Sequence, residues 1–208
     1  MHDTEGVIRF QLEHADVQLQ PDPAIDELIH WHTIMFRLGL VGRDPRRYGG
    51  YAYGNMSQRT DCEKFIISGT QTGGLETLTI QHYAIVDHCD VAHNQVRSHG
   101  PARPSSECMT HAAIYNANAD VHAIVHAHSP VIWQHWQQLD IPTTAKDIAY
   151  GTPEMAAAVA DCLKRTGDTP QGSIAMLGHE DGVITYAHEL ETASLEMTRL
   201  LACAGTLN

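Results

Sequence analysis

The segment Val121–Ser129 limits most narrowly what this chain can fold into. It reads VHAIVHAHS, an apolar run with histidines at 122, 126 and 128. A short apolar run rich in valine and isoleucine is typical of a buried strand. Residues two apart on a strand share a face and lie about 6.6 Å apart along it. His126 and His128 therefore lie on one face of a strand inside the protein, whereas His122 is about 13 Å from His126 by strand rise and is interpreted as structural.

Two imidazoles on one buried face favour a metal site. A single histidine in such a strand is more often a core residue whose hydrogen bonds are satisfied. Two are costly to bury without partners, and neutral imidazole is the commonest metal ligand in proteins. We therefore predict that His126 and His128 bind one ion, with the tetrahedral nitrogen and oxygen ligands that zinc accepts.

A catalytic zinc site needs a third protein ligand and an open position. His179 is the best candidate, because it lies between two glycines at the mouth of a predicted strand pair. His188 and His111 are alternatives, and both fall on predicted helices. His111 follows Glu107 by four residues on the same helix face, so we expect it to act on the site through other residues. Spacing alone leaves His179 open between a ligand and a turn histidine.

Short apolar strands alternate with amphipathic helices along the rest of the chain, without a repeat or a long linker. This pattern predicts one mixed α/β domain over residues 1–208, with helices interspersed among the strands of one sheet. The predicted strands are Val7–Leu12, Lys64–Ser68, His82–Asp87, Val121–His128, Ile174–Leu177 and Val183–Tyr186. The predicted helices are one opened by Pro21–Pro23 with Ile25, Leu28, His32 and Met35 on one stripe, then Ser105–Tyr115, Pro153–Leu163 and Glu189–Cys203.

The charge balance excludes some partners. Lys and Arg number 13 against 25 Asp and Glu, a formal net charge of −12, which argues against nucleic acid or an anionic membrane as the main partner. Apolar stretches fall short of the roughly 20 residues that span a bilayer, and the acidic N-terminus resembles no secretory signal. The five cysteines are odd in number and form no CxxC pair. We therefore expect reduced thiols and a cytoplasmic protein.

Three segments are candidate anion sites. Pro104–Glu107 reads PSSE before a predicted helix: this is either ordinary helix capping or a helix start that binds phosphate. In the second case Glu107 is a candidate general base. Gly54–Arg59 and Ser68–Gly74 are either backbone cradles or plain turns. Neither has the glycine spacing of a nucleotide site.

Taken in order, these segments resemble the class II aldolase/adducin family. The resemblance spans roughly Ile29 to Leu201 and leaves the strand before Pro21 outside it. The motifs that carry it are GNMSQR at 54–59, FIISGTQTG at 65–73, PSSE at 104–107, THAAIY at 110–115, VHAIVHAHS at 121–129, YGTPEM at 150–155 and GHEDGVITYAHELETA at 178–193.

The resemblance implies a three-layer α/β/α fold around a mainly antiparallel sheet, and a homotetramer with active sites at subunit interfaces. It implies that Glu107 is the general acid/base. It also implies a divalent metal, most often zinc, and a sugar phosphate bound largely through hydroxyls and backbone amides. The implied metal ligands are His126, His128 and His179, and the implied phosphate-binding residues are Asn55, Thr72, Gly73, Ser105 and Ser106.

The reaction implied is cleavage of a ketose 1-phosphate, of the fuculose-phosphate type, to dihydroxyacetone phosphate and an aldehyde. The metal would act as a Lewis acid, and Glu107 would carry a proton to and from carbon. Glutamate rather than aspartate at this position favours an aldolase over an epimerase. A sugar-phosphate epimerase or dehydratase stays an alternative, as does a non-enzymatic module like the adducin head domains, which should lack the metal ligands.

The chain departs from the known aldolases at two places. His179 is followed by Glu-Asp-Gly where they have glycine directly, so we expect a longer turn here. The aldolases also use tyrosines of a neighbouring subunit and of the C-terminal tail as proton donors. No tyrosine follows Tyr186 in this chain, so the sequence does not show which residue takes that role.

Overall fold

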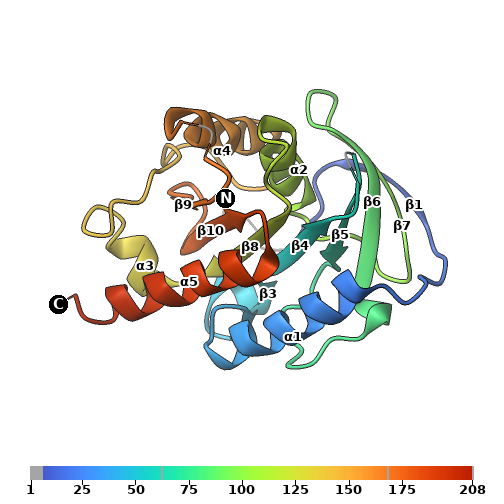
Figure 1. Cartoon of the computed structure of the whole chain (residues 1–208), viewed down its shortest axis with the longest axis horizontal. Helices are drawn as coiled ribbons and strands as arrows, with labels where there is room; N and C mark the ends of the chain where they lie inside the picture. Colours follow the sequence, from blue (N-terminus) through green and yellow to red (C-terminus); the bar gives the residue numbers. More distant parts are fainter. Residues whose placement is uncertain (1–6, 62, 168, 208) are drawn as a thin grey trace.

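The computed structural model describes residues 7–61, 63–167 and 169–207, and a large mixed sheet runs through it (Figure 1). Eight strands follow the order β1-β7-β6-β5-β4-β8-β10-β9. Neighbouring strands are antiparallel except for β1 and β7, which are parallel. The strands are β1 (Gln11–Ala15), β4 (Asn55–Arg59), β5 (Phe65–Ser68), β6 (Tyr83–Asp90), β7 (Gln95–His99), β8 (Ala123–His128), β9 (Gly172–Ala175) and β10 (Gly182–Ala187), with a separate ribbon of β2 (Gly42–Arg43) and β3 (Ala52–Tyr53).

Helices cover both faces of this sheet. They are α1 (Pro23–Arg37), α2 (Cys108–Ala117), α3 (Pro130–Gln134), α4 (Pro153–Arg165) and α5 (Leu190–Ala204), with short 3₁₀ turns at Tyr48–Gly50 and Ile80–His82. Alternate residues of a strand face opposite sides, and β8 shows this directly. Ala123, Val125 and Ala127 pack with α1 and α5, whereas Ile124 packs with α2 and α4. The expected three-layer α/β/α fold around a mainly antiparallel sheet is confirmed.

The amphipathic helices form where the sequence predicts them. In α1 the Asp22 side chain accepts a hydrogen bond from the amide of Ala24 at 2.9 Å, Pro23 opens the first turn, and the predicted apolar stripe is buried. In α4 Thr152 caps the amide of Met155 at 3.2 Å. Both caps satisfy amide groups that a helix start leaves without a partner.

Several predicted strand boundaries are wrong. The strand predicted at Ile174–Leu177 is Gly172–Ala175, the one predicted at Val121–His128 begins at Ala123, and the one predicted at His82–Asp87 is Tyr83–Asp90.

Three further differences have a local reason. The first strand is Gln11–Ala15 rather than Val7–Leu12, because its hydrogen-bond partner β7 pairs from Gln95 to His99. The helix predicted from Ser105 begins at Cys108, because Ser105–Glu107 form a turn in which the Cys108 amide donates to the Ser105 carbonyl at 3.1 Å. His188, expected on a helix, lies in the bend before α5.

β4, β7, α3 and the small ribbon were not predicted from the sequence. β4 is the important omission, because its polar residues were interpreted as a loop. It is an inner strand that pairs with β5 on one side and β8 on the other.

Among the described residues no helix is both long and apolar enough to cross a membrane. Cys89, Cys108, Cys162 and Cys203 are free thiols, as predicted; Cys62 lies outside the described residues.

Candidate metal centre

His126 and His128 lie at the end of β8; β4 and β10 flank His126, and β10 flanks His128. In the sheet register, His126 is opposite Asn55 of β4 and Ile184 of β10, and His128 is opposite Gly182. The two imidazoles are 0% and 1% exposed, and their ring centroids lie 5.1 Å apart. The prediction that they share one buried face is confirmed.

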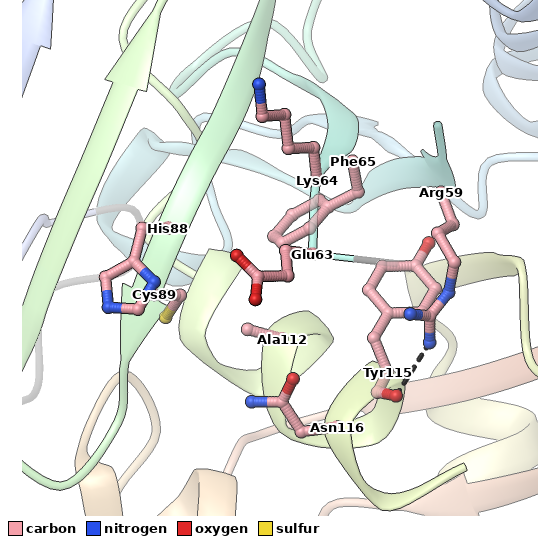
Figure 2. Close-up of a pocket in the computed structure, with 9 residues that line it drawn as sticks. All are labelled: Arg59, Glu63, Lys64, Phe65, His88, Cys89, Ala112, Tyr115 and Asn116. Carbon is pink, nitrogen blue, oxygen red and sulfur yellow. Dashed lines mark hydrogen bonds between the residues drawn. The ribbon is translucent and has the colours of Figure 1, made fainter. Parts of the chain in front are cut away.

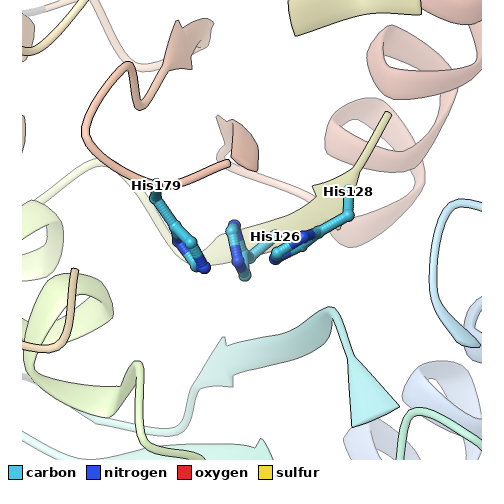
Figure 3. Close-up of side chains that lie close together, drawn as sticks. All are labelled: His126, His128 and His179. Atoms are coloured by element: carbon cyan, nitrogen blue, oxygen red, sulfur yellow. The ribbon is translucent and has the colours of Figure 1, made fainter. Parts of the chain in front are cut away.

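His179 approaches them from the turn between β9 and β10. Its amide donates to the Met176 carbonyl and its carbonyl accepts from the Gly182 amide, each at 2.9 Å. The His179 ring centroid lies 5.1 Å from that of His126 and 4.6 Å from that of His128. Figure 3 shows the three imidazoles turned toward one another, and one nitrogen from each lies within 4.8 Å of the others.

Burial keeps the strand-borne imidazoles neutral. It lowers the pKa of His126 and of His128 well below the ordinary value, and the neighbouring His179 lowers both further. Neither ring nitrogen of His126 makes a hydrogen bond of normal geometry among the described residues. The nearby backbone of Val183 offsets part of the fall in the pKa of His126. Buried polar atoms of this kind call for a partner. Three imidazoles on a common centre are a donor set that fits a divalent metal such as zinc.

Glu107 lies beside this cluster, just before the first turn of α2. Its side chain is 1% exposed, and Oε1 is 4.0 Å from Nδ1 of His179. The Thr110 hydroxyl donates to Oε2 at 3.2 Å, and the Glu107 amide donates to the Ser105 hydroxyl at 3.3 Å. These contacts fix a carboxylate next to the predicted ligands, so a group able to move a proton lies close to any ion that they hold.

His111 lies one helical turn beyond Glu107 and supports the strand side of the cluster. Its Nδ1 is 2.7 Å from the hydroxyl of Ser57 on β4, which is 2.7 Å from the hydroxyl of Tyr115. Burial lowers the pKa of His111 to about 3, so the imidazole is uncharged. The neutral network of His111, Ser57 and Tyr115 therefore underlies β4, and His111 is not one of the clustered imidazoles.

The predicted phosphate-binding segments meet next to this cluster. Gly69 bridges Pro104, and the Ser105 amide donates to the Ser68 carbonyl at 3.2 Å, so the loop after β5 lies against the start of α2. A Cβ on Gly73 would lie 2.3 Å from the Tyr53 carbonyl oxygen, so only glycine fits there. All four other predicted side chains are buried: Asn55, Thr72, Ser105 and Ser106.

Two of these side chains differ in how they are engaged. Asn55 begins β4 and is buried, and its Oδ1 has no hydrogen-bond partner among the described residues. The Thr72 hydroxyl donates to the Gly69 carbonyl at 2.7 Å. The Asn55 side chain therefore has an acceptor that the described residues do not use, whereas the Thr72 side chain holds the shape of its own loop.

Aromatic and charged residues that the sequence analysis did not single out also surround the histidines. The Tyr48 ring packs edge-on against His128 with centroids 4.6 Å apart, and the Tyr150 ring stacks on His179 at 4.4 Å. The Tyr48 hydroxyl donates to Asp181 at 2.6 Å. Burial, and then this hydrogen bond, raise the pKa of Tyr48. No spacing pattern marks these residues, because they reach the site through loops.

A separate cavity of about 130 Å³ is lined by residues of α2, β4, β5 and β6 (Figure 2). It contains none of the predicted site residues. Its cationic side chains are engaged, since the Arg59 guanidinium donates to the Tyr115 carbonyl at 2.6 Å and the Lys64 ammonium is 3.6 Å from Asp87. The histidine cluster, and not this cavity, is therefore the candidate functional site.

The sequence matches a family model over residues 44–207, the family described as "Class II Aldolase and Adducin N-terminal domain". The chain belongs to this family. The match begins later than the resemblance that starts near Ile29, so α1 lies outside it.

Solved structures of similar fold carry related names. An L-fuculose 1-phosphate aldolase is 19% identical, with a TM-score of 0.67 over 90% of this chain and 85% of that one. A sugar-phosphate aldolase from Thermotoga maritima is 14% identical, with a TM-score of 0.68 over 88% and 92%. YgbL from Klebsiella pneumoniae, named for an aldolase, epimerase or decarboxylase, is 19% identical, with a TM-score of 0.66 over 89% and 88%. At these identities the likeness establishes the fold.

Proposed function

We propose that this protein is a zinc-dependent class II aldolase, a lyase that cleaves a ketose 1-phosphate of the fuculose-phosphate type to dihydroxyacetone phosphate and an aldehyde. One observation carries the proposal. Three buried imidazoles have nitrogens within 4.8 Å of one another, and a buried carboxylate, Glu107, lies 4.0 Å from His179. This arrangement joins a metal site to a proton carrier, which are the two groups that aldol cleavage needs.

His126, His128 and His179 would hold the ion and leave a position open for substrate. When bound, zinc supplies Lewis-acid stabilisation of the negative charge that develops on substrate oxygen. The neutrality of His126 and His128, which burial enforces, favours cation binding because no proton has to be displaced from them.

The substrate phosphate would lie where three segments meet. The Asn55 Oδ1, which has no partner among the described residues, would accept a hydrogen bond from a phosphate hydroxyl. Alternatively, the side-chain amide would rotate so that its NH2 group donates to a phosphate oxygen. The backbone amide of Gly73 and the hydroxyls of Ser105 and Ser106 would supply further donors. The Thr72 amide donates to the Gly69 carbonyl at 3.3 Å, so Thr72 would shape the loop that presents the Gly73 amide. Hydroxyls and amides bind an anion without a basic residue, so the net charge of −12 does not oppose this role.

Glu107 would exchange a proton with the carbon next to the carbonyl of dihydroxyacetone phosphate. The Thr110 hydroxyl holds Oε2, while Oε1 is the oxygen nearer to His179. In cleavage the Glu107 carboxylate would accept the proton of the hydroxyl on the carbon that becomes the aldehyde, and would return it to the carbon of dihydroxyacetone phosphate once the carbon–carbon bond has broken. In condensation the same two proton transfers would run in reverse.

A panel of ketose 1-phosphates tests the proposal, with zinc-loaded protein and enzymatic detection of dihydroxyacetone phosphate. We expect product from at least one sugar. Glu107→Gln should keep its metal but lose about 100- to 10,000-fold in cleavage rate, and His128→Ala should lose both metal and cleavage. Absence of dihydroxyacetone phosphate from every sugar with fully loaded protein would rule out the aldolase.

A sugar-phosphate epimerase or dehydratase is the alternative, because the same cluster and carboxylate serve those reactions and one structural neighbour is named for several of them. NMR spectra of the products from the same panel distinguish epimers and dehydration products from cleavage. The cluster of three potential ligands argues against a non-enzymatic adducin-like module.

We further propose a homotetramer in the cytoplasm. The family resemblance supports the tetramer, and four free thiols among the described residues fit a reducing compartment. Light scattering on the purified protein would give the mass of a tetramer, whereas the mass of a monomer, 22.9 kDa, would exclude it.

A further inference from the structure

Asp181 connects the two parts of the histidine cluster through its backbone. It lies two residues after His179 in the turn between β9 and β10, with a left-handed φ of 61°. Its carbonyl accepts a hydrogen bond from the amide of Ser129 at 2.8 Å, and Ser129 directly follows His128. The backbone of one residue therefore joins the turn that carries His179 to the end of the strand that carries His128.

The carboxylate of Asp181 makes a second connection. Its Oδ2 accepts from the Tyr48 hydroxyl at 2.6 Å and from Nη2 of Arg47 at 2.8 Å. The Asp181 side chain is 9% exposed and that of Arg47 is 32% exposed, so the ion pair is largely shielded from water. Hydrogen bonds to an ionised carboxylate are among the stronger ones in proteins.

Tyr48 carries this connection to the ring of His128. The two rings meet edge-on at 73°, and the Arg47 guanidinium lies 4.7 Å above the Tyr48 ring. Tyr48 also has a left-handed φ of 49°, which a bulky residue adopts only where its surroundings enforce it. Asp181 and Tyr48, 133 residues apart, therefore hold each other in uncommon conformations.

We propose that Asp181 is a positioning residue that fixes His179 relative to His128 and so prepares the cluster for a divalent cation. The inference rests on the proposed function, since it assumes that the three histidines bind metal. Groups behind metal ligands orient them, and their loss typically lowers metal affinity by about 10- to 100-fold. It also gives a role to the longer turn after His179, because Asp181 is one of the residues that lengthen it.

Cobalt binding to metal-free protein tests this directly. Dissociation constants come from competition with a chelator, and the visible absorption of bound Co²⁺ reports the ligand geometry. We expect Asp181→Asn to weaken Co²⁺ binding by about 10- to 100-fold and to change the spectrum. Tyr48→Phe should shift both in the same direction by less, because it keeps the carboxylate and Arg47. Glu196→Gln, which breaks the exposed pair with Arg199, is the matched control and should change neither.

Thermal unfolding of each metal-free variant separates positioning from folding. The proposal predicts weaker cobalt binding and an altered spectrum at temperatures where metal-free Asp181→Asn is fully folded. Wild-type affinity and an unchanged spectrum in Asp181→Asn would overturn it, as would a loss shared by Glu196→Gln. If the wild-type protein itself binds neither cobalt nor zinc, the proposed function fails, and the inference with it.

Discussion

The strand side and the turn side of the histidine cluster are held in place differently. His126 and His128 lie on an inner strand whose backbone pairs with β4 and β10, above the neutral network of His111, Ser57 and Tyr115. His179 lies on a turn, and contacts from distant parts of the chain support it. The Tyr150 ring stacks on His179, and the Ile148 backbone lies against the neighbouring Gly178. Asp181, in the same turn, is hydrogen-bonded to Arg47 and Tyr48.

The difference shows what each kind of support provides. Sheet pairing fixes the spacing of two ligands through local geometry, because alternate residues always share a face. A turn has no such rule, so its ligand depends on tertiary contacts that can be removed one at a time. We therefore expect changes near His179 to alter metal binding as well as stability, and changes under β8 to alter mainly stability.

Removal of a ligand should have the largest effect. His126→Ala, His128→Ala and His179→Ala should each lower zinc affinity by roughly 10³-fold or more, measured by chelator competition. His179→Ala should retain the most binding, since it leaves the rigid strand pair intact. Stronger residual binding in His128→Ala than in His179→Ala would contradict the comparison.

Gly178→Ala should have the next largest effect, because it alters the turn that carries His179. A Cβ on Gly178 would lie 1.8 Å from the Ile148 carbonyl oxygen, so the turn must move away from the segment before α4. We expect a loss of about 2–3 kcal/mol in the free energy of unfolding and weaker metal binding, from urea denaturation and zinc titration. Gly205→Ala is the control, because its nearest contact is 3.4 Å; equal effects from both would refute the assignment.

His111 makes the strand side sensitive to acid. Its pKa is about 3 in the fold and about 6.5 in the unfolded chain. Below pH 6.5 the unfolded chain therefore binds a proton that the folded one excludes, and the free energy of unfolding falls as the pH falls toward 3. His111→Asn should reduce the loss between pH 7 and pH 4.5 by about 2 kcal/mol, measured by urea denaturation of metal-free protein. If the free energy of unfolding fell by the same amount in His111→Asn and in the wild type, His111 would not be the group whose protonation destabilises the fold.

Arg9 should have the smallest effect. Its guanidinium lies 4.9 Å above the Tyr150 ring, which stacks on His179, and its Nη1 donates to the Tyr150 carbonyl at 3.3 Å. Arg9→Ala should cost about 0.5–1 kcal/mol of stability and weaken zinc binding by a few-fold. Arg46→Ala removes an exposed side chain that pairs with Asp44, and it should do neither. Identical zinc titrations for Arg9→Ala and Arg46→Ala would show that Arg9, in the segment before residue 44, does not support the turn that carries His179.

The same contrast explains how much the sequence predicted. The period of two in Val121–Ser129 is local, so it predicted that His126 and His128 share a face. The prolines at the start of α1 and its apolar stripe predicted that helix. His179 stayed open on spacing alone, because only the tertiary fold brings its turn to β8. The contact between Tyr48 and Asp181 was not predicted, because the two residues lie 133 positions apart in the sequence.

β4 was missed for a related physical reason. Its residues Asn55–Arg59 are mostly polar, and an isolated polar pentapeptide next to glycine is typical of a turn. In the fold, β5 and β8 satisfy its backbone, and Ser57 bonds with His111 and Tyr115. The cost of burying polar side chains is met by partners that no local pattern reveals.

Metal content decides whether His126, His128 and His179 form a metal site. Wild-type protein, the Glu107→Gln variant and a variant with alanine at His126, His128 and His179 would each be dialysed against zinc and analysed by mass spectrometry for bound metal. The account predicts about one ion per chain for the first two and essentially none for the third. Equal zinc in the triple variant and the wild type would contradict it.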